Sequence, residues 1–174
     1  MNPETSKTWT SLPGPENINR FELPNGIILL TRSNFDSPSV VISGYLPGGG
    51  MFDTDEKLGL ANFTAMCLMR GTVHRSFQDI FNLLESIGAN LGFGASMHNI
   101  SFGGRCLTED LPALLELFAD CLRYPSFPID HVERLRYQLL TALAIRAQDT
   151  ADMASLDFNR VMFGNHPYAR PEDG

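Results

Sequence analysis

Residues 58–72 read LGLANFTAMCLMRGT, a pattern that predicts a largely buried helix. Apolar side chains recur here at the spacing that places them on one face of a helix. They are Leu60, Phe63, Cys67 and Leu68. The acidic, cap-forming residues 53–56 precede the run, and Gly71 ends it. We therefore expect a helix from about Leu58 to Arg70.

Short β-branched or alternating runs predict strands on both sides of this helix. Asn25-Gly26 separates the first two runs, and this dipeptide supplies the positive φ angles of a tight hairpin turn. The third run ends at residues 48–50, three glycines that we expect to form a flexible loop. Two later Gly-rich runs flank a turn at Met97-His98 and predict an antiparallel pair. The expected strands cover residues 20–23, 27–30, 40–46, 90–96 and 99–105.

Amphipathic patterns predict further helices along the chain. Ser76 is placed to cap one of them, and Pro125 ends another. The expected helices cover residues 58–70, 77–87, 108–122, 129–147 and 153–163. This order of elements predicts an α+β fold, with helices layered on an antiparallel sheet. Residues 1–18 are polar and contain several prolines, so we expect a flexible tail there and one domain over residues 19–174.

The composition argues against several kinds of partner. The 174 residues carry 13 basic and 20 acidic side chains, a net charge of -7, which disfavours nucleic acid and anionic membranes. Residues 1–18 lack a signal peptide, and no run approaches the ~18 apolar residues of a membrane span. We therefore expect a cytoplasmic protein. The cysteines are far apart and form no Cys-x-x-Cys pair, so free, buried thiols in a reducing compartment are expected. They are Cys67, Cys106 and Cys121.

Residue chemistry by itself predicts no active site. The histidines lack i+3 or i+4 partners, which favours solvated or capping roles over metal ligation. They are His74, His98, His131 and His166. Gly48–Gly50 is not followed by the Lys-Ser or Lys-Thr of a phosphate-binding loop. The carboxylates of Glu109, Asp110, Asp152 and Asp157 lie at helix starts or on helix faces, where the helix dipole and solvent account for them.

Residues 58–72 nevertheless resemble the signature helix of the pitrilysin/insulinase family of zinc metallopeptidases. In active members this frame reads Gly-Leu-Ala-His-Phe-x-Glu-His-Met-x-x-x-Gly-Thr, with His-x-x-Glu-His at its centre. Other segments resemble family counterparts in the same order, namely residues 24–26, 84–89, 108–111, 149–150 and 166–171. The resemblance extends from about Asn19 to Pro171. The alternative is an ordinary core helix in an unrelated fold.

The sequence departs from the family pattern at the catalytic positions. His-x-x-Glu-His places two zinc ligands and a general base on one helix face. Asn62, Ala65 and Met66 occupy those places, and the family's third ligand, a Glu on a later helix, aligns with Ala142. A second acidic position of that helix aligns with Leu135. The resemblance therefore implies a chain that is inactive by itself and holds no zinc or other cofactor.

The alignment at the later helix is open to a shift of one residue. Such a shift would place Thr141 or Leu143 at the third ligand position, and neither restores a zinc site. With ionisable groups replaced, we expect the face that carries Met66 to pack against residues 139–143 in a dry, mostly apolar contact.

The resemblance implies a role beside another subunit. In two-component enzymes of the family, one subunit carries zinc and a relative without the motif completes the chamber. We therefore expect a non-catalytic subunit that encloses and positions peptide for a homologous zinc-bearing partner, or that self-associates. A purely structural assembly subunit is the alternative, and an independently active peptidase is a third reading. The chain stops short of a complete family repeat, so we expect a fragment or truncated product.

In this family the substrate resembles an added strand, paired to the sheet edge that follows the signature helix. The matching stretch is residues 90–96, and its candidate peptide-binding residues are Gly92, Phe93, Gly94, Ala95 and Ser96. Such pairing depends on main-chain hydrogen bonds, for which small side chains leave room. The alternative is that these glycines only accommodate sheet curvature or a bulge.

Overall fold

The computed structural model describes residues 14–174. The chain forms two compact units, one ending at Pro38 and the other running from Ser39 to Gly174. Most of the tail predicted over residues 1–18 lies outside the described residues, and its last part contains a 3-10 turn at Pro15–Asn17. The domain boundary predicted at residue 19 stays a prediction.

The first unit contains the predicted hairpin. Strands β1 (Asn19–Glu22) and β2 (Ile28–Thr31) pair antiparallel, with Asn19 opposite Thr31. Gly26 lies in the turn with a φ of 83°, which a residue with a side chain rarely adopts. The hairpin prediction is confirmed.

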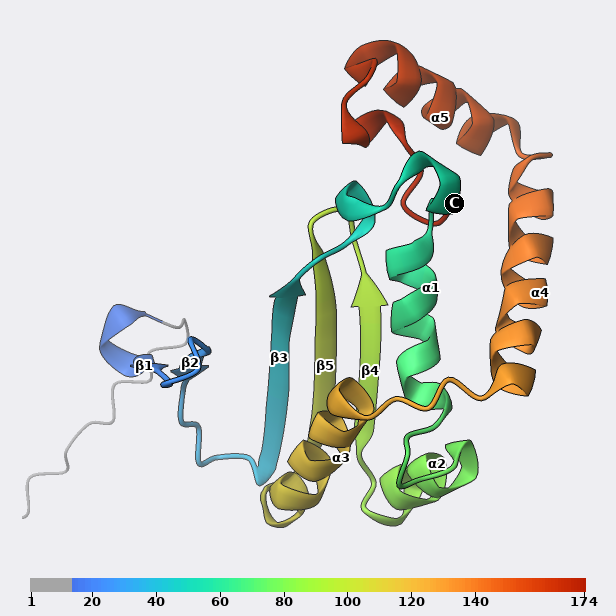
Figure 1. Ribbon diagram of the computed structural model, residues 1–174. Coiled ribbons are helices and arrows are strands. Elements are labelled where there is room, and N and C mark those ends of the chain that lie inside the picture. Colours follow the sequence, from blue (N-terminus) through green and yellow to red (C-terminus); the bar gives the residue numbers. More distant parts are fainter. Residues whose placement is uncertain (1–13) are drawn as a thin grey trace, which may run out of the picture. The chain divides into compact units, whose positions relative to one another are not determined.

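The second unit is built on an antiparallel sheet of three strands in the order β3-β5-β4 (Figure 1). The strands are β3 (Ser39–Pro47), β4 (Asn90–Ala95) and β5 (Asn99–Leu107). β5 lies in the centre because it pairs with β4 through a short turn and with β3 along its whole length. β4 is therefore an edge strand of this sheet.

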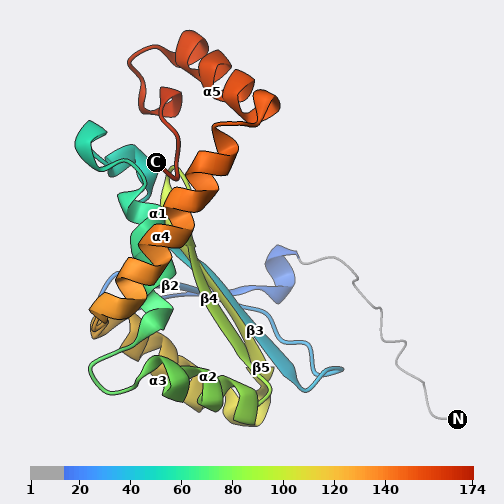
Figure 2. The same ribbon diagram turned by 90° about the vertical axis from the view of Figure 1, so that its right-hand side faces the viewer.

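Five helices accompany this sheet in the described part of the unit. They are α1 (Leu60–Cys67), α2 (Phe77–Ser86), α3 (Leu111–Arg123), α4 (Ile129–Arg146) and α5 (Thr150–Phe163). Figure 2 shows α2 and α3 on one side of the sheet. The core lies between them and the strands, and its buried members are Ile80, Leu84, Cys106, Leu114, Leu117 and Cys121. The predicted α+β class is confirmed.

Local capping sets where two helices begin. α1 starts at Leu60, later than predicted, because Gly59 has a φ of 82° and the Asp53 carboxylate accepts the Ala61 N–H at 3.2 Å. α5 starts at Thr150, earlier than predicted, because Asp149 caps it by accepting backbone N–H groups of the first turn. No helix within residues 14–174 is long and apolar enough to cross a membrane.

The glycine loop after β3 is fixed, contrary to the flexible loop that we predicted. Gly49 and Gly50 are buried, and Gly50 donates its N–H to the Ser96 carbonyl at 3.0 Å. A Cβ on Gly49 would lie 2.8 Å from the Asn99 nitrogen, and its φ of 108° also requires glycine. The glycines therefore allow two backbones to meet closely, which attaches the end of β3 to the β4–β5 turn.

Candidate functional site

The three motif positions lie along α1, which contacts β4 and α4. Ala65 is buried, and Asn62 and Met66 are half-buried. A fully exposed Met66 would have contradicted the predicted packing against residues 139–143. The half-buried Met66 is compatible with that prediction.

The inward face of α4 is only partly the one that we predicted. Leu135 is buried, Leu139 and Leu143 are half-buried, and Ala142 is exposed. Spacings of four residues place the three leucines on one helix face. Since Ala142 points to solvent, Leu143 is the better match to an inward ligand position, and the assignment to Ala142 stays a prediction.

The side chains at the motif positions do not fit zinc. Protein zinc sites use thiolates, imidazoles and carboxylates, whereas Asn62 offers an amide, Ala65 a methyl group and Met66 a soft thioether. Within residues 14–174, no three or more His, Cys, Asp or Glu side chains are grouped so that they could hold a metal ion. The arrangement also lacks a base at position 65 to activate water.

A cavity of about 640 Å³ joins this face of α1 to the end of β4. Asn62 lines it from α1 and Ala95 from β4, and α5 and the segment after it form the other walls. His98 also lines it, with its Nε2 2.6 Å from the Tyr168 hydroxyl. His98 and Tyr168 are 70 residues apart in the sequence, so their contact could not be predicted from residue spacing.

The outer edge of β4 presents unpaired backbone groups. The Ser96 N–H donates to the Asn99 carbonyl at 2.9 Å, which makes these residues a hydrogen-bonded pair. Hydrogen-bonded and non-hydrogen-bonded pairs alternate along an antiparallel ladder, so every second residue of β4 directs its N–H and C=O away from β5. These residues are Leu91, Phe93 and Ala95. Within residues 14–174, their outward groups have no hydrogen-bond partner.

Within the predicted peptide-binding stretch, Phe93 contacts the core, whereas the glycines face largely open space. Phe93 packs into the core, stacked on Phe118 at 5.8 Å between ring centroids. A Cβ on Gly92 would have no neighbour within 4 Å, and one on Gly94 would meet only the Ser101 hydroxyl at 3.5 Å. The pairing with β5 is continuous, without a bulge. Packing within this chain therefore does not require glycine at these two positions.

A buried carboxylate that sequence reasoning missed holds the segment after α1. Asp120 on α3 accepts the Thr72 hydroxyl at 2.7 Å, the His74 Nδ1 at 2.6 Å and an Arg75 nitrogen at 2.7 Å. Burial by itself would raise the pKa of Asp120, but the hydrogen bonds from these side chains hold it below its usual value. The Gly-Thr pair at the end of the motif thus has a structural role. The only sequence signal was Thr72 itself.

The remaining histidines and the cysteines follow the predictions in part. His166 caps a turn by accepting the Tyr168 N–H, as expected, whereas His74 pairs with a buried acid. Cys67, Cys106 and Cys121 are free and buried, which confirms the thiol prediction. Burial raises the pKa of Cys121 to about 11, so this thiol is unreactive.

Comparisons with known proteins agree with this architecture. The family model described as Insulinase (Peptidase family M16) matches residues 29–171. Over 68% of its length, the chain is 26% identical to the probable mitochondrial-processing peptidase subunit beta of Arabidopsis thaliana, of which it covers 22%. Over 89% of its length, it is 27% identical to an uncharacterized zinc protease of Mycobacterium tuberculosis, of which it covers 35%. The crystal structure of a peptidase M16 inactive domain from Pseudomonas fluorescens matches 91% of the chain with a TM-score of 0.86 and 26% identity, and the chain covers 39% of it.

The fold and the site define a peptidase-type α+β domain without a zinc-binding motif. The chain belongs to the insulinase family, peptidase family M16. The resemblance noted in residues 58–72 is therefore confirmed. The chain spans less than two fifths of the length of these relatives.

Proposed function

We propose that this chain is a non-catalytic M16 domain that holds an extended peptide at the edge of β4, for cleavage by a homologous zinc-bearing subunit. The observation that carries the proposal is the outer edge of β4, which is unpaired and lies beside the altered motif face of α1. The substrate class is peptide in extended conformation.

The absence of catalysis by this domain follows from its donor set. Hydrolysis by this family type needs a metal-bound water and a base beside it. Asn62, Ala65 and Met66 supply neither, so a partner subunit has to contribute the zinc. The relative from Arabidopsis thaliana, which is named as a subunit of a processing peptidase, supports an assembly of this kind.

Binding of peptide follows from the backbone of β4. Phe93 and Ala95 direct N–H and C=O groups outward, and an added strand would pair with both. Gly92 and Gly94 leave space that packing within the chain does not use, and glycine in a strand often marks a place where another backbone approaches. The cavity beyond Ala95 has room for a side chain of the peptide.

The test uses Ala95→Pro, which removes an outward donor and leaves the pairing with β5 in place. Gly94 precedes it and tolerates the restriction that proline imposes on its neighbour. Binding of a fluorescein-labelled peptide of alternating Val and Thr is measured by anisotropy, and an analogue with Pro at every second position tests for main-chain pairing. We expect Ala95→Pro to weaken binding about fivefold, since it removes one main-chain hydrogen bond and such a bond contributes about 1 kcal/mol.

The matched control is Thr150→Pro, a proline at the first residue of α5, which is exposed and lies outside the cavity at β4. It should bind within about twofold of the original chain, a difference well below 1 kcal/mol. If Ala95→Pro folds and binds the peptide unchanged, the proposal is wrong and the structural-subunit alternative replaces it.

A further inference from the structure

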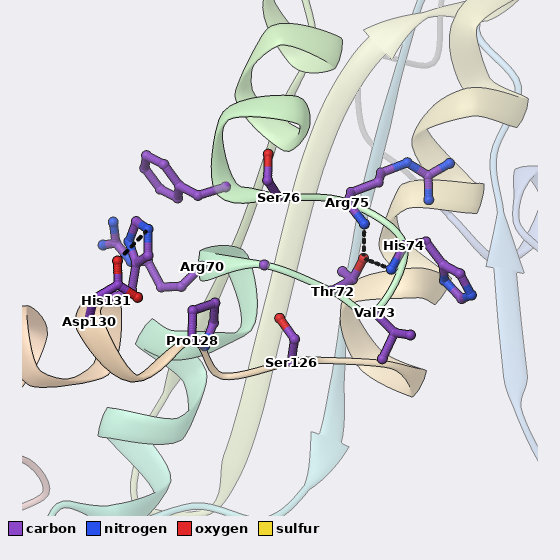
Figure 3. A pocket seen from close by; sticks show the side chains of 12 residues that line it. Arg70, Thr72, Val73, His74, Arg75, Ser76, Ser126, Pro128, Asp130 and His131 are labelled. Atoms are coloured by element: carbon purple, nitrogen blue, oxygen red, sulfur yellow. Dashed lines mark hydrogen bonds and ion pairs between the residues drawn. The ribbon is translucent and has the colours of Figure 1, made fainter.

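A second cavity, of about 420 Å³, lies at the opposite end of α1 from the β4 cavity. The segment after α1 and the segment that begins α4 form its walls (Figure 3). Its lining includes Arg70, Phe77, Ser126, Pro128 and His131. It shares no residue with the cavity at β4.

Arg70 brings a cation without a counter-charge to this cavity. Its Nε is buried and has no hydrogen-bond partner, and no carboxylate among residues 14–174 forms an ion pair with it. Its guanidinium carbon lies 5.3 Å from the centre of the Phe77 ring. Stacking on an aromatic ring leaves the in-plane N–H groups of an arginine free to donate. Buried donors in native proteins nearly always have an acceptor, so this one indicates a missing partner.

His131 supplies a second donor beside the same ring. Its ring centroid lies 4.9 Å from that of Phe77, and its side chain is 21% exposed. The nearest carboxylate oxygen, on Asp130, is 3.9 Å from Nε2, which is too long for a hydrogen bond. Both Arg70 and His131 thus contact the Phe77 ring, and Figure 3 shows them toward the same end of the cavity in that view.

Several other polar groups of the cavity are already used, while the exposed Asp130 carboxylate lies 3.9 Å from His131 and the Ser126 hydroxyl also lines the cavity. Arg75 pairs with Glu116 and Asp120, and His74 pairs with Asp120. Ser76 exchanges hydrogen bonds with Asp79 at the start of α2. Arg70, His131 and the Ser126 hydroxyl are therefore the donors that remain for a ligand, and Arg70 is the one that always carries a charge.

We infer that this cavity binds an anionic group on an organic stem, either a carboxylate or a phosphate, through Arg70 and His131. A guanidinium matches the two oxygens of either anion with paired hydrogen bonds. Phe77 and Pro128 provide an apolar wall for the stem, and the volume far exceeds the ~30 Å³ of one water molecule. The site is independent of peptide binding at β4.

The test follows the His131 ring resonance by NMR in the 174-residue chain. The probes are N-acetylglutamate N-methylamide, its neutral glutamine analogue, and inorganic phosphate. We expect a saturable shift of His131 with the glutamate probe or with phosphate, and none with the glutamine probe. The probe that binds more tightly shows whether the natural ligand carries a carboxylate or a phosphate.

Arg70→Gln should weaken anion binding at least about tenfold, because a charge-assisted pair of hydrogen bonds is lost. Arg136→Gln is the control, since Arg136 is exposed, pairs with Glu133 and lies outside the cavity. Unchanged binding by a folded Arg70→Gln variant would overturn the inference, as would an equal response to the glutamine probe.

A second measurement keeps the inference testable if Arg70→Gln does not fold. In the original chain, the anions should shift His131 and leave His98, at the β4 cavity, unaffected. Equal shifts of both rings would mean non-specific ion binding. No shift up to about 50 mM, a concentration that would saturate even a millimolar site, would also overturn it.

Discussion

The two ends of the signature segment have different chemical roles in this chain. Over residues 62–66 the ionisable groups of the family motif are replaced by an amide, a methyl group and a thioether. At Thr72 the segment keeps a dense set of hydrogen bonds to the buried Asp120. The catalytic groups of the family motif are thus separable from the anchor at Thr72, because this chain lacks the former and keeps the latter.

The largest expected effect comes from returning a carboxylate to the motif face. Ala65 is 2% exposed, so Ala65→Glu would bury an unpaired charge and lower the free energy of unfolding by about 4 kcal/mol. Urea denaturation measures the change. The control is Ala119→Glu, the same substitution at an exposed position of α3, which should change stability by less than about 0.5 kcal/mol.

Removal of the anchor should have the next largest effect. Asp120→Ala leaves the Thr72 hydroxyl and the Arg75 guanidinium without their shared acceptor, and we expect a loss of about 3 kcal/mol. Asp157→Ala removes an exposed partner of Arg160 and should cost less than about 0.5 kcal/mol. Equal losses from the two variants would contradict the role assigned to Asp120.

Acid should destabilise the domain through the same group. Because the folded state holds the pKa of Asp120 below its unfolded value of about 3.9, the stabilisation is present above pH 4 and is lost as the pH falls through the folded pKa. Asp120→Asn should therefore have a flatter loss of stability below about pH 4 than the original chain. Unfolding at a series of pH values tests this, and parallel curves would show that other carboxylates dominate.

The smallest effect is expected from restoring one ligand. Met66→His should cost about 1 kcal/mol, since a polar ring replaces a half-buried apolar side chain. It should create neither zinc binding nor peptidase activity, because the other ligands and the base are still missing. Elemental analysis of the original and variant chains checks this. About one tightly held zinc per chain in either protein would refute the account of the motif face.

Local patterns predicted most of the fold but not its long-range contacts. The Asn25-Gly26 hairpin and the Ser76 cap followed from rules that act over a few residues. The strand order β3-β5-β4 depends on contacts between distant segments, and the hydrogen bond between Thr72 and Asp120 joins the segment after α1 to α3. Gly49 was misjudged because its role depends on a neighbouring backbone that sequence spacing does not reveal.

The candidate site was predictable to a similar degree. The motif positions on α1 and the edge strand after it were inferred from the resemblance to the family. Ala142 was assigned through an alignment that is open to a shift of one residue, and on α4 Ala142 is exposed whereas Leu143 is half-buried. The cavity at Arg70 and His131 could not be predicted, because its donors come from segments that meet only in the folded chain.

The alternating direction of the β4 backbone has a consequence for amide hydrogen exchange. The N–H groups of Gly92 and Gly94 point toward β5 and should exchange slowly, whereas those of Phe93 and Ala95 point outward and should exchange quickly. The free domain would then show a two-residue rhythm of fast and slow exchange along this strand. A peptide paired to this edge would slow the exchange of the Phe93 and Ala95 amides, so that the alternation disappears. The exchange rate of each of these amides would then report whether peptide is bound at that position.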